Sequence, residues 1–195
     1  MITPKSTAIT NKSRAVTGEA AQASPQTSTA GAQKYLITSQ NSKIEFVGSK
    51  VTGSHNGSFG DFSGEIDYAS SPETSRVNIT MKIDSITTAS PGLDKHLKTA
   101  DFFDVAKYPE ASFVSTAIKA GGENGASHTV TGNLTMHGVT KAITFPATIN
   151  VTPDAATVES NFSINRKDFG INYAGAADNL IRDNVVLTLH VRATK

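Results

Sequence analysis

Apolar residues recur at every second position through most of the chain beyond Tyr35. This period of two is typical of β-strands that bury one face and leave the other in water. It is clearest over residues 77–83, 143–151 and 185–191, where Val, Ile, Leu, Met and Phe alternate with polar side chains or small ones. Shorter or less regular runs of the same kind cover residues 44–46, 62–68, 113–118, 130–136 and 158–164. We therefore predict seven or eight strands, with His137-Gly138 as one hairpin turn.

The strands are joined by short Gly, Asn and Ser turns and are not separated by regularly alternating helices. This arrangement favours an all-β antiparallel barrel or sandwich over a βαβ fold. Small residues fall on the apolar side of four strands, at Gly64, Gly132, Ala147 and Ser160. Because small inward side chains leave space, we expect an apolar cavity. A filled core remains the alternative.

One stretch, Pro91 to Phe113, breaks the alternation. Ser90 is a suitable N-cap, and Pro91 occupies a first-turn position that tolerates proline. The apolar face of the predicted helix carries Leu93, His96 and Leu97, and the following turn carries Phe102 and Phe103. This short helical segment between strands is expected to act as an apolar lid on the barrel.

The 195 residues suffice for one domain with a full core. Residues 1–34 are rich in Ser, Thr and Ala without periodicity, and they predict a disordered tether before a domain at residues 35–195. The tether holds no apolar signal-peptide core, so we expect that an export signal has been removed. The absence of cysteine excludes disulfides and thiol catalysis. The sequence contains no basic stripe of the kind that indicates nucleic-acid binding.

Several motifs carry no chemistry. Asp168-Phe169-Gly170 matches a kinase triplet without the other kinase motifs, and the glycine-rich run Gly53 to Gly60 lacks a phosphate-binding lysine, so we interpret it as a hairpin loop. No serine lies in a G-x-S-x-G motif. No two histidines have metal-binding spacing; they are His55, His96, His128, His137 and His190. We assign no catalytic residue, metal or cofactor.

Five stretches together resemble the YceI-like family of polyisoprenoid-binding proteins. They are SKIEFVGSKVTGSHNGSFGDFSGEI (42–66), DSITT (84–88), LDKHLKTADFFDVAKYPEASFVS (93–115), VTGNLTMHGVTKAITFPATI (130–149) and INRKDFGI (164–171). The resemblance implies an eight-stranded antiparallel lipocalin-like barrel with a helical cap, exported to the periplasm or beyond. It also implies a long apolar lipid, an isoprenoid or similar chain, held along the barrel axis for sequestration or transport. The long Ser/Thr-rich tail is a departure from the family pattern, because the barrel does not require it.

The residues expected to contact such a ligand lie on the inward rows and the lid. They are Phe46, Phe62, Met81, Ile83, Leu93, His96, Leu97, Phe102, Phe103, Phe113, Gly132, Leu134, Met136, Phe145, Ala147, Phe162, Phe169, Leu187 and Leu189. Candidates for an anionic head group are Arg166, Lys167 and Arg182, with solvation at the surface as their alternative role. An enzyme acting on the lipid, using His96 or Ser160, and a barrel without ligand remain alternative functions. The lipid's identity, a homodimer and a lipid-anchored N-terminus are left open.

Overall fold

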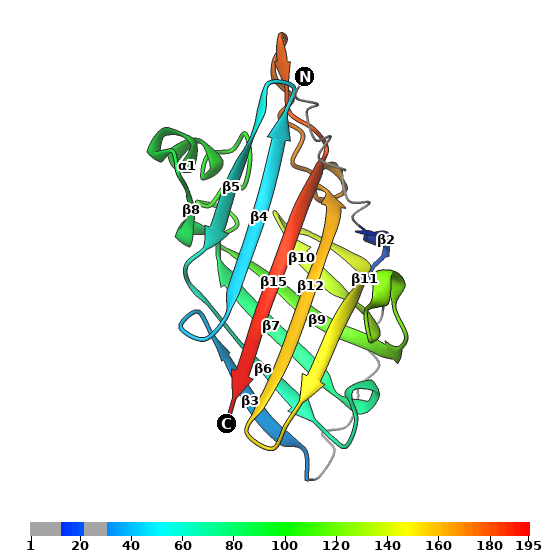
Figure 1. Cartoon of the computed structure of the whole chain (residues 1–195). Helices are drawn as coiled ribbons and strands as arrows, with labels where there is room; N and C mark the ends of the chain where they lie inside the picture. The colour runs from blue at the N-terminus through cyan, green and yellow to red at the C-terminus, as the bar shows by residue number, and fades with distance from the viewer. Residues whose placement is uncertain (1–12, 22–30) are drawn as a thin grey trace, which may run out of the picture.

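The computed structural model describes residues 13–21 and 31–195, and most of them lie in β-strands (Figure 1). In chain order the strands are β1 (Ser13–Arg14), β2 (Val16–Glu19), β3 (Gln33–Thr38), β4 (Lys43–Lys50), β5 (Gly53–Phe59), β6 (Phe62–Tyr68), β7 (Arg76–Lys82), β8 (Ile86–Thr88), β9 (Glu110–Ala120), β10 (His128–Met136), β11 (Val139–Val151), β12 (Ala155–Asn165), β13 (Gly175–Ala176), β14 (Asn179–Leu180) and β15 (Asn184–Thr194). The helical segments are α1 (Pro91–Leu97) and the 3₁₀ turns η1 (Pro72–Thr74), η2 (Ile83–Ser85), η3 (Glu123–Gly125) and η4 (Arg166–Phe169).

Eight antiparallel strands close into a barrel, as the sequence predicts. Three of the eight barrel strands are interrupted, and each consists of two consecutive segments: β3 and β4, β5 and β6, and β7 and β8. In the first two of these, β3 pairs with β6 and β4 pairs with β5. Strands β9, β10, β11, β12 and β15 supply the other five. Strand β15 pairs with β12 on one side and with β4 and the end of β3 on the other, which closes the sheet. Each strand of the ring therefore pairs with a neighbour on both sides, and β11 and β12 pair with each other only from Thr148 to Val151 of β11.

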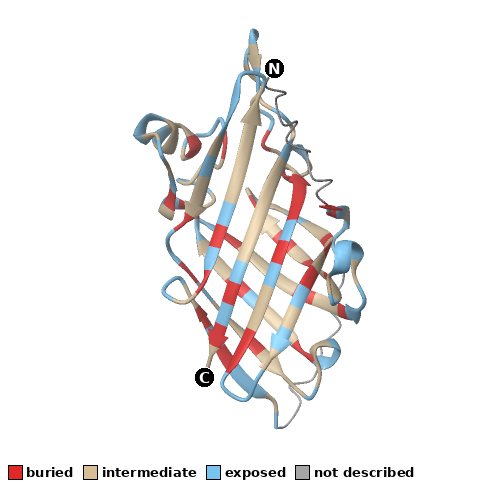
Figure 2. Ribbon diagram, viewed as in Figure 1, coloured by how far each residue is buried: buried red, intermediate tan, exposed pale blue. Residues whose placement is uncertain are grey.

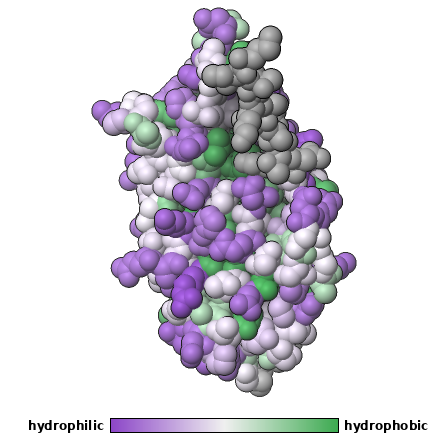
Figure 3. Space-filling view, in the orientation of Figure 1, coloured by the Kyte–Doolittle hydropathy of each residue, from purple (hydrophilic) through white to green (hydrophobic). Residues whose placement is uncertain are grey.

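The buried residues follow the alternation read from the sequence. Figure 2 shows buried segments alternating with less buried ones along the strands that face the viewer. Inside the barrel, the ring of Phe145 stacks on that of Phe162 at 4.2 Å between centroids and lies 5.7 Å from that of Phe113. Figure 3 shows hydrophilic residues interspersed with pale and hydrophobic ones on the face of the barrel formed by β4, β15 and β12. The two faces of each strand therefore set the barrel's inside and outside.

Local signals place the turn and the helix where the sequence predicts them. His137 and Gly138 both have positive φ angles, 52° and 74°, as the tight hairpin between β10 and β11 requires. Helix α1 starts after Ser90, whose side-chain oxygen accepts a hydrogen bond from the backbone N–H of Leu93 at 3.4 Å. Pro91 occupies its first turn. No helix in the described ranges is long and apolar enough to cross a membrane.

The glycine-rich run that we interpreted as a hairpin loop is instead strand β5, so that prediction is wrong. It pairs with β4 along its whole length and with β8 near its end. Gly57 allows this pairing because a Cβ there would lie 2.2 Å from Cζ of Phe46, its partner on β4. The polar composition of the run hid a strand whose stability comes from its neighbours.

Part of the predicted tether is ordered against the barrel. Residues 13–21 contain β1, which runs parallel to β12, and β2, which is antiparallel to β11. The prediction of disorder is therefore wrong for this part, and residues 1–12 and 22–30 lie outside the described structure. Strand β3 begins at Gln33, close to the domain boundary expected at Tyr35.

Candidate functional site

The barrel encloses an apolar cavity of about 200 Å³. Its wall draws on β4, β5, β6, β7, β9, β10, β11, β12 and β15 and on the segment after α1, so it extends along most of the barrel. Apart from Gly48 and Arg166, every lining residue has a purely apolar side chain. Such a cavity offers dispersion contacts and exclusion of water, and almost no polar recognition.

Most of the predicted ligand-contacting residues line this cavity. They are Phe46, Met81, Ile83, Leu97, Phe102, Phe103, Phe113, Leu134, Met136, Phe145, Phe162, Leu187, Leu189 and the head-group candidate Arg166. The sequence analysis omitted further lining residues: Ile44, Gly48, Phe59, Ile66, Val77, Ile79, Ala111, Ile118, Val130, Ile143, Ile149, Val158, Ile164, Ile171, Ile181, Val185 and Val191. Many of the omitted residues share a strand and a parity with predicted ones, so consistent use of the two-residue period would have found them.

The other predicted residues do not line the cavity. They are Phe62, Leu93, His96, Gly132, Ala147, Lys167, Phe169 and Arg182. Phe62 and Ala147 are buried in the surrounding core, and Leu93 packs against it. Phe169 is fully buried in η4, where its carbonyl oxygen contacts His137 Nδ1 at 3.1 Å. These side chains support the wall and do not border the space inside it.

The small inward residues do not create the cavity, so that part of the reasoning is wrong. A Cβ on Gly132 would lie 2.3 Å from Cζ of Phe113, because the phenylalanine ring already occupies this position. A Cβ on Gly64 would lie 2.2 Å from the carbonyl oxygen of Asn78 on the neighbouring strand. The hydroxyl of Ser160 donates to the carbonyl oxygen of Pro146. Gly64, Gly132 and Ser160 thus each permit a close contact and leave no void of their own.

The end of α1 and the turn after it cover the cavity, but His96 does not face it. Leu97, Phe102 and Phe103 line the space, as expected of a lid. The Nε2 atom of His96 instead lies 2.8 Å from Oδ2 of Asp101 at the surface, and its ring packs edge-on against Phe102. Interaction with the aspartate turns the imidazole away from the barrel interior, which corrects its assignment as a ligand contact.

Arg166 is buried, with 4% of its surface exposed, at the end of the cavity near α1. Its Nε donates to the carbonyl oxygen of Arg182 at 3.2 Å, Nη1 to that of Ile171 at 2.7 Å and Nη2 to that of Ile181 at 3.4 Å. Burial lowers the pKa of the guanidinium, and Asp183, 3.6 Å from Nη2, partly offsets this effect. The guanidinium therefore holds the loop that precedes β15.

This geometry does not support the other head-group candidates as cavity residues. Lys167 is exposed and pairs with Asp183 at 3.0 Å, and Arg182 is also exposed. Neither side chain lines the cavity. Surface solvation, the alternative that the sequence left open, describes both residues.

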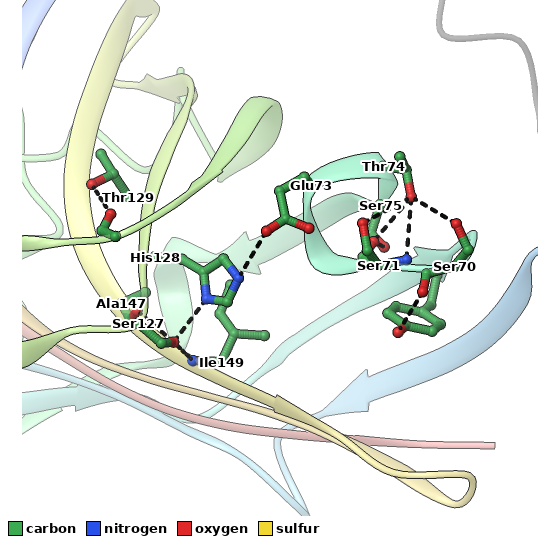
Figure 4. Close-up of polar contacts among 12 residues, drawn as sticks. Ser70, Ser71, Glu73, Thr74, Ser75, Ser127, His128, Thr129, Ala147 and Ile149 are labelled. Carbon is green, nitrogen blue, oxygen red and sulfur yellow. Dashed lines mark hydrogen bonds and ion pairs between the residues drawn. The ribbon is translucent and has the colours of Figure 1, made fainter.

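A second polar cluster lies at the opposite end of the barrel (Figure 4). Ser127 Oγ accepts a hydrogen bond from the N–H of Ile149 at 2.9 Å and lies 2.7 Å from Nδ1 of His128. The other ring nitrogen of His128, Nε2, lies 3.4 Å from Oε1 of Glu73. None of the three side chains lines the cavity. The cluster connects η1 to the start of β10 through Glu73 and His128, and to β11 through Ser127 and Ile149.

The carboxylate of this cluster is favoured in its charged form. A hydrogen bond from the Ser71 side chain is the main cause that lowers the pKa of Glu73, followed by the backbone N–H of Glu73 and by His128. No group of three His, Asp or Glu residues in the described chain has the geometry of a metal site. The cluster is therefore an electrostatic tie between loops.

An eight-stranded antiparallel barrel with a short helix and an apolar interior is a lipocalin-like barrel. The family model for the YceI-like domain matches residues 35–193, so this chain belongs to the YceI-like family. Residues 13–21 lie outside the matched domain.

Individual relatives agree with this assignment. A UPF0312 protein of Pseudomonas putida strain GB-1 is 45% identical over 127 residues, which are 62% of this chain and 65% of the relative. The crystal structure of BcnA from Burkholderia cenocepacia superposes with a TM-score of 0.72 at 24% identity, covering 81% of this chain and 99% of BcnA. A polyisoprenoid binding domain from Saccharophagus degradans, implicated in plant cell wall breakdown, gives a TM-score of 0.65 at 18% identity, covering 84% and 98%. At these identities the two structures show a shared fold.

Proposed function

We propose that this protein binds a long apolar lipid, an isoprenoid or a similar chain, in its barrel and sequesters or transports it without chemical change. The observation that carries the proposal is the apolar cavity of about 200 Å³ along the barrel. An apolar cavity excludes water and gains free energy when an apolar group fills it. Each buried methylene contributes about 0.8 kcal/mol, so a long chain can bind tightly without polar contacts.

The cavity's shape supports a chain-like ligand. Its volume lies below the roughly 300–1,000 Å³ of pockets for drug-sized molecules, yet nine strands contribute to its wall. A small volume distributed along a barrel describes a narrow channel, which accommodates an extended chain better than a fused ring system. Because Arg166 directs its nitrogens to backbone carbonyls, a polar head group would be left outside this channel.

The Saccharophagus degradans domain, described as polyisoprenoid binding, supports an isoprenoid as the cargo of the same fold. We also propose that the protein acts in the periplasm or outside the cell, where a carrier would move an insoluble lipid through water. The lack of cysteine suits an exported protein. Homodimerisation and lipid anchoring of the N-terminus stay predictions.

An enzyme acting on the lipid would need a reactive polar group beside the cavity. The two candidates from the sequence, His96 and Ser160, contact Asp101 and the carbonyl of Pro146 instead, and neither lines the space. This placement favours binding over catalysis.

Native mass spectrometry of the protein purified from its own host, followed by titration of the delipidated protein with all-trans-retinol, tests the proposal. Ala111→Phe would place a ring in the cavity, because Ala111 lines it on β9, whereas Ser112→Phe on the outward side of the same strand is the matched control. We expect wild type and Ser112→Phe to bind and Ala111→Phe to lose binding while keeping its β circular dichroism. Equal binding by both variants, or no lipid on wild type in either experiment, would contradict lipid binding in this cavity.

A further inference from the structure

The barrel wall has a seam between β11 and β12. These strands pair only from Thr148 opposite Glu159 to Val151 opposite Ala156. Toward the α1 end of the barrel they share no ladder pairs, although both strands continue. Pro146 stands where pairing stops, and its missing N–H removes a donor that a continued ladder could use. No backbone ladder holds the two strands together in this stretch of wall, and a side-chain bond from the Ser160 hydroxyl to the carbonyl oxygen of Pro146 crosses it.

Residues 13–21, which we call the seal segment, occupy this seam. Its first part, β1, lies beside β12 with Ser13 opposite Phe162, and its second part, β2, lies beside β11 with Thr17 opposite Ile143. The N–H of Ala15 donates to the carbonyl oxygen of Ser163 at 2.8 Å. Figure 1 shows β2 next to β11 on the right-hand side of the barrel. The seal segment thus connects β11 and β12 along the stretch where these two strands share no ladder pairs.

The cavity lies directly behind the seal segment. Its register partners Phe162 and Ile143 both line the cavity. Ala15 is 3% exposed and belongs to the hydrophobic core, so its methyl group faces inward. Val16 points the other way and is 70% exposed. Only the backbone and a few small side chains of this segment close the wall here.

The seal segment is lightly held in comparison with the strands around it. Between Ser13 and Glu19, Ala15 is the one buried apolar residue. The ion pair between Glu19 and Lys141 is at the surface, with 95% of the glutamate side chain exposed. At its end, Ala21 exchanges two hydrogen bonds with the Asn133 side chain, 3.0 and 2.7 Å long. Few buried apolar contacts are typical of segments that open locally while the rest of a domain stays folded.

We propose that the seam between β11 and β12 is the entrance to the cavity and that the seal segment is its removable cover. The proposal rests on the proposed function, because it describes how the apolar chain reaches the barrel. Releasing the cover breaks its own hydrogen bonds and no β11–β12 ladder, since these strands share no ladder pairs there and only the Ser160 side chain bonds across the seam. A long chain can then enter sideways along its length, without passing through an end of the barrel.

Because the chain has no native cysteine, a disulfide can lock the cover cleanly. Val16 and Thr144 are opposite each other on β2 and β11 and share the outward parity. Cross-strand partners have Cα atoms about 4.5–5.5 Å apart, which lies within the range that disulfides span. In the full chain carrying Val16→Cys and Thr144→Cys, stopped-flow uptake of all-trans-retinol should slow at least tenfold on oxidation and recover on reduction. The equilibrium occupancy should be the same in both forms.

Two point variants test the opposite direction. Ala15→Asp places a charge in the core behind the seam, so it should release the seal segment and speed uptake about tenfold. Val16→Asp, on the exposed side of the same segment, should match wild type. Hydrogen exchange at the backbone amide of residue 15 measures release of the seal segment directly. It should be fast in Ala15→Asp and slow in Val16→Asp.

The outcomes separate this proposal from lipid binding. If wild type takes up no retinol at equilibrium, the proposed function fails and the entrance fails with it. If retinol binds but the oxidised and reduced forms take it up at the same rate, or Ala15→Asp behaves like Val16→Asp, the ligand enters elsewhere. In that case the seam proposal is overturned while lipid binding stands.

Discussion

Replacement of Arg166 by methionine separates a structural role from a ligand-binding one. The side chain keeps a similar length and apolar stem but loses the guanidinium. Three backbone carbonyls, of Ile171, Ile181 and Arg182, then lose their donor, and Asp183 loses one of its two cationic neighbours. We expect the variant to fold with reduced stability and to keep its capacity for an apolar ligand.

The magnitude follows from these bonds and from the cost of burying the charge. A hydrogen bond from a charged donor contributes about 1.5–3 kcal/mol, so three of them set an upper range of about 4.5–9 kcal/mol. Burial opposes this gain, as the lowered pKa of Arg166 shows, and the freed carbonyls near the barrel end can be hydrated. A net loss of about 3 kcal/mol is therefore expected, below the sum of the three hydrogen bonds. For a chain of this size it lowers the melting temperature by about 6–12 °C.

Thermal unfolding of the delipidated protein and retinol titration measure the two effects. Arg182→Met is the matched control, because this neighbouring arginine is exposed and should change stability by less than about 0.5 kcal/mol. The reasoning is refuted if Arg166→Met melts like wild type and loses ligand binding. That result would show that the guanidinium serves the ligand and not the loop.

Three further predictions concern the wall, the lid and the far end of the barrel. Gly132→Ala should destabilise the protein by about 1–3 kcal/mol in urea unfolding, because the new methyl displaces the Phe113 ring; unchanged stability would contradict the close contact. Phe103→Asp should accelerate retinol dissociation without loss of the β circular dichroism, and an unchanged rate would show that the lid does not retain the ligand. The folded state lowers the pKa of Glu73, so its contribution to stability is present above its unfolded pKa and is lost as pH falls through the lower, folded value. The stability difference between wild type and Glu73→Gln should therefore disappear in acid, and a difference independent of pH would contradict this linkage.

The sequence predicts the barrel well because its two faces differ along almost every strand. A period of two is a local property, and alternation such as that of Val77, Ile79 and Met81 fixes which side chains point inward before any pairing is known. Helix α1 is equally local, since Ser90 and Pro91 mark its start. These features need no knowledge of distant residues.

Features that depend on distant partners escape sequence reasoning. Strand β5 has few apolar residues, and its conformation comes from pairing with β4 and β8. The seal segment has no periodicity, and a gap between two other strands decides its place. The burial of Arg166 depends on carbonyls up to 16 positions away, so the sequence suggested a head-group contact or a solvated charge and not a tie to the backbone of a distant loop.

Glycine illustrates how a correct expectation can have the wrong cause. The sequence analysis expected the inward Gly132 to leave a hole, whereas the Phe113 ring fills this position; in the same way the Phe46 ring lies over Gly57 of β5. Both rings nevertheless line the cavity. Because a glycine has no side chain, each ring can lie directly against the strand that carries it. The glycines thus let large aromatic side chains pack against the wall, and these rings form part of the apolar surface that an apolar chain would contact.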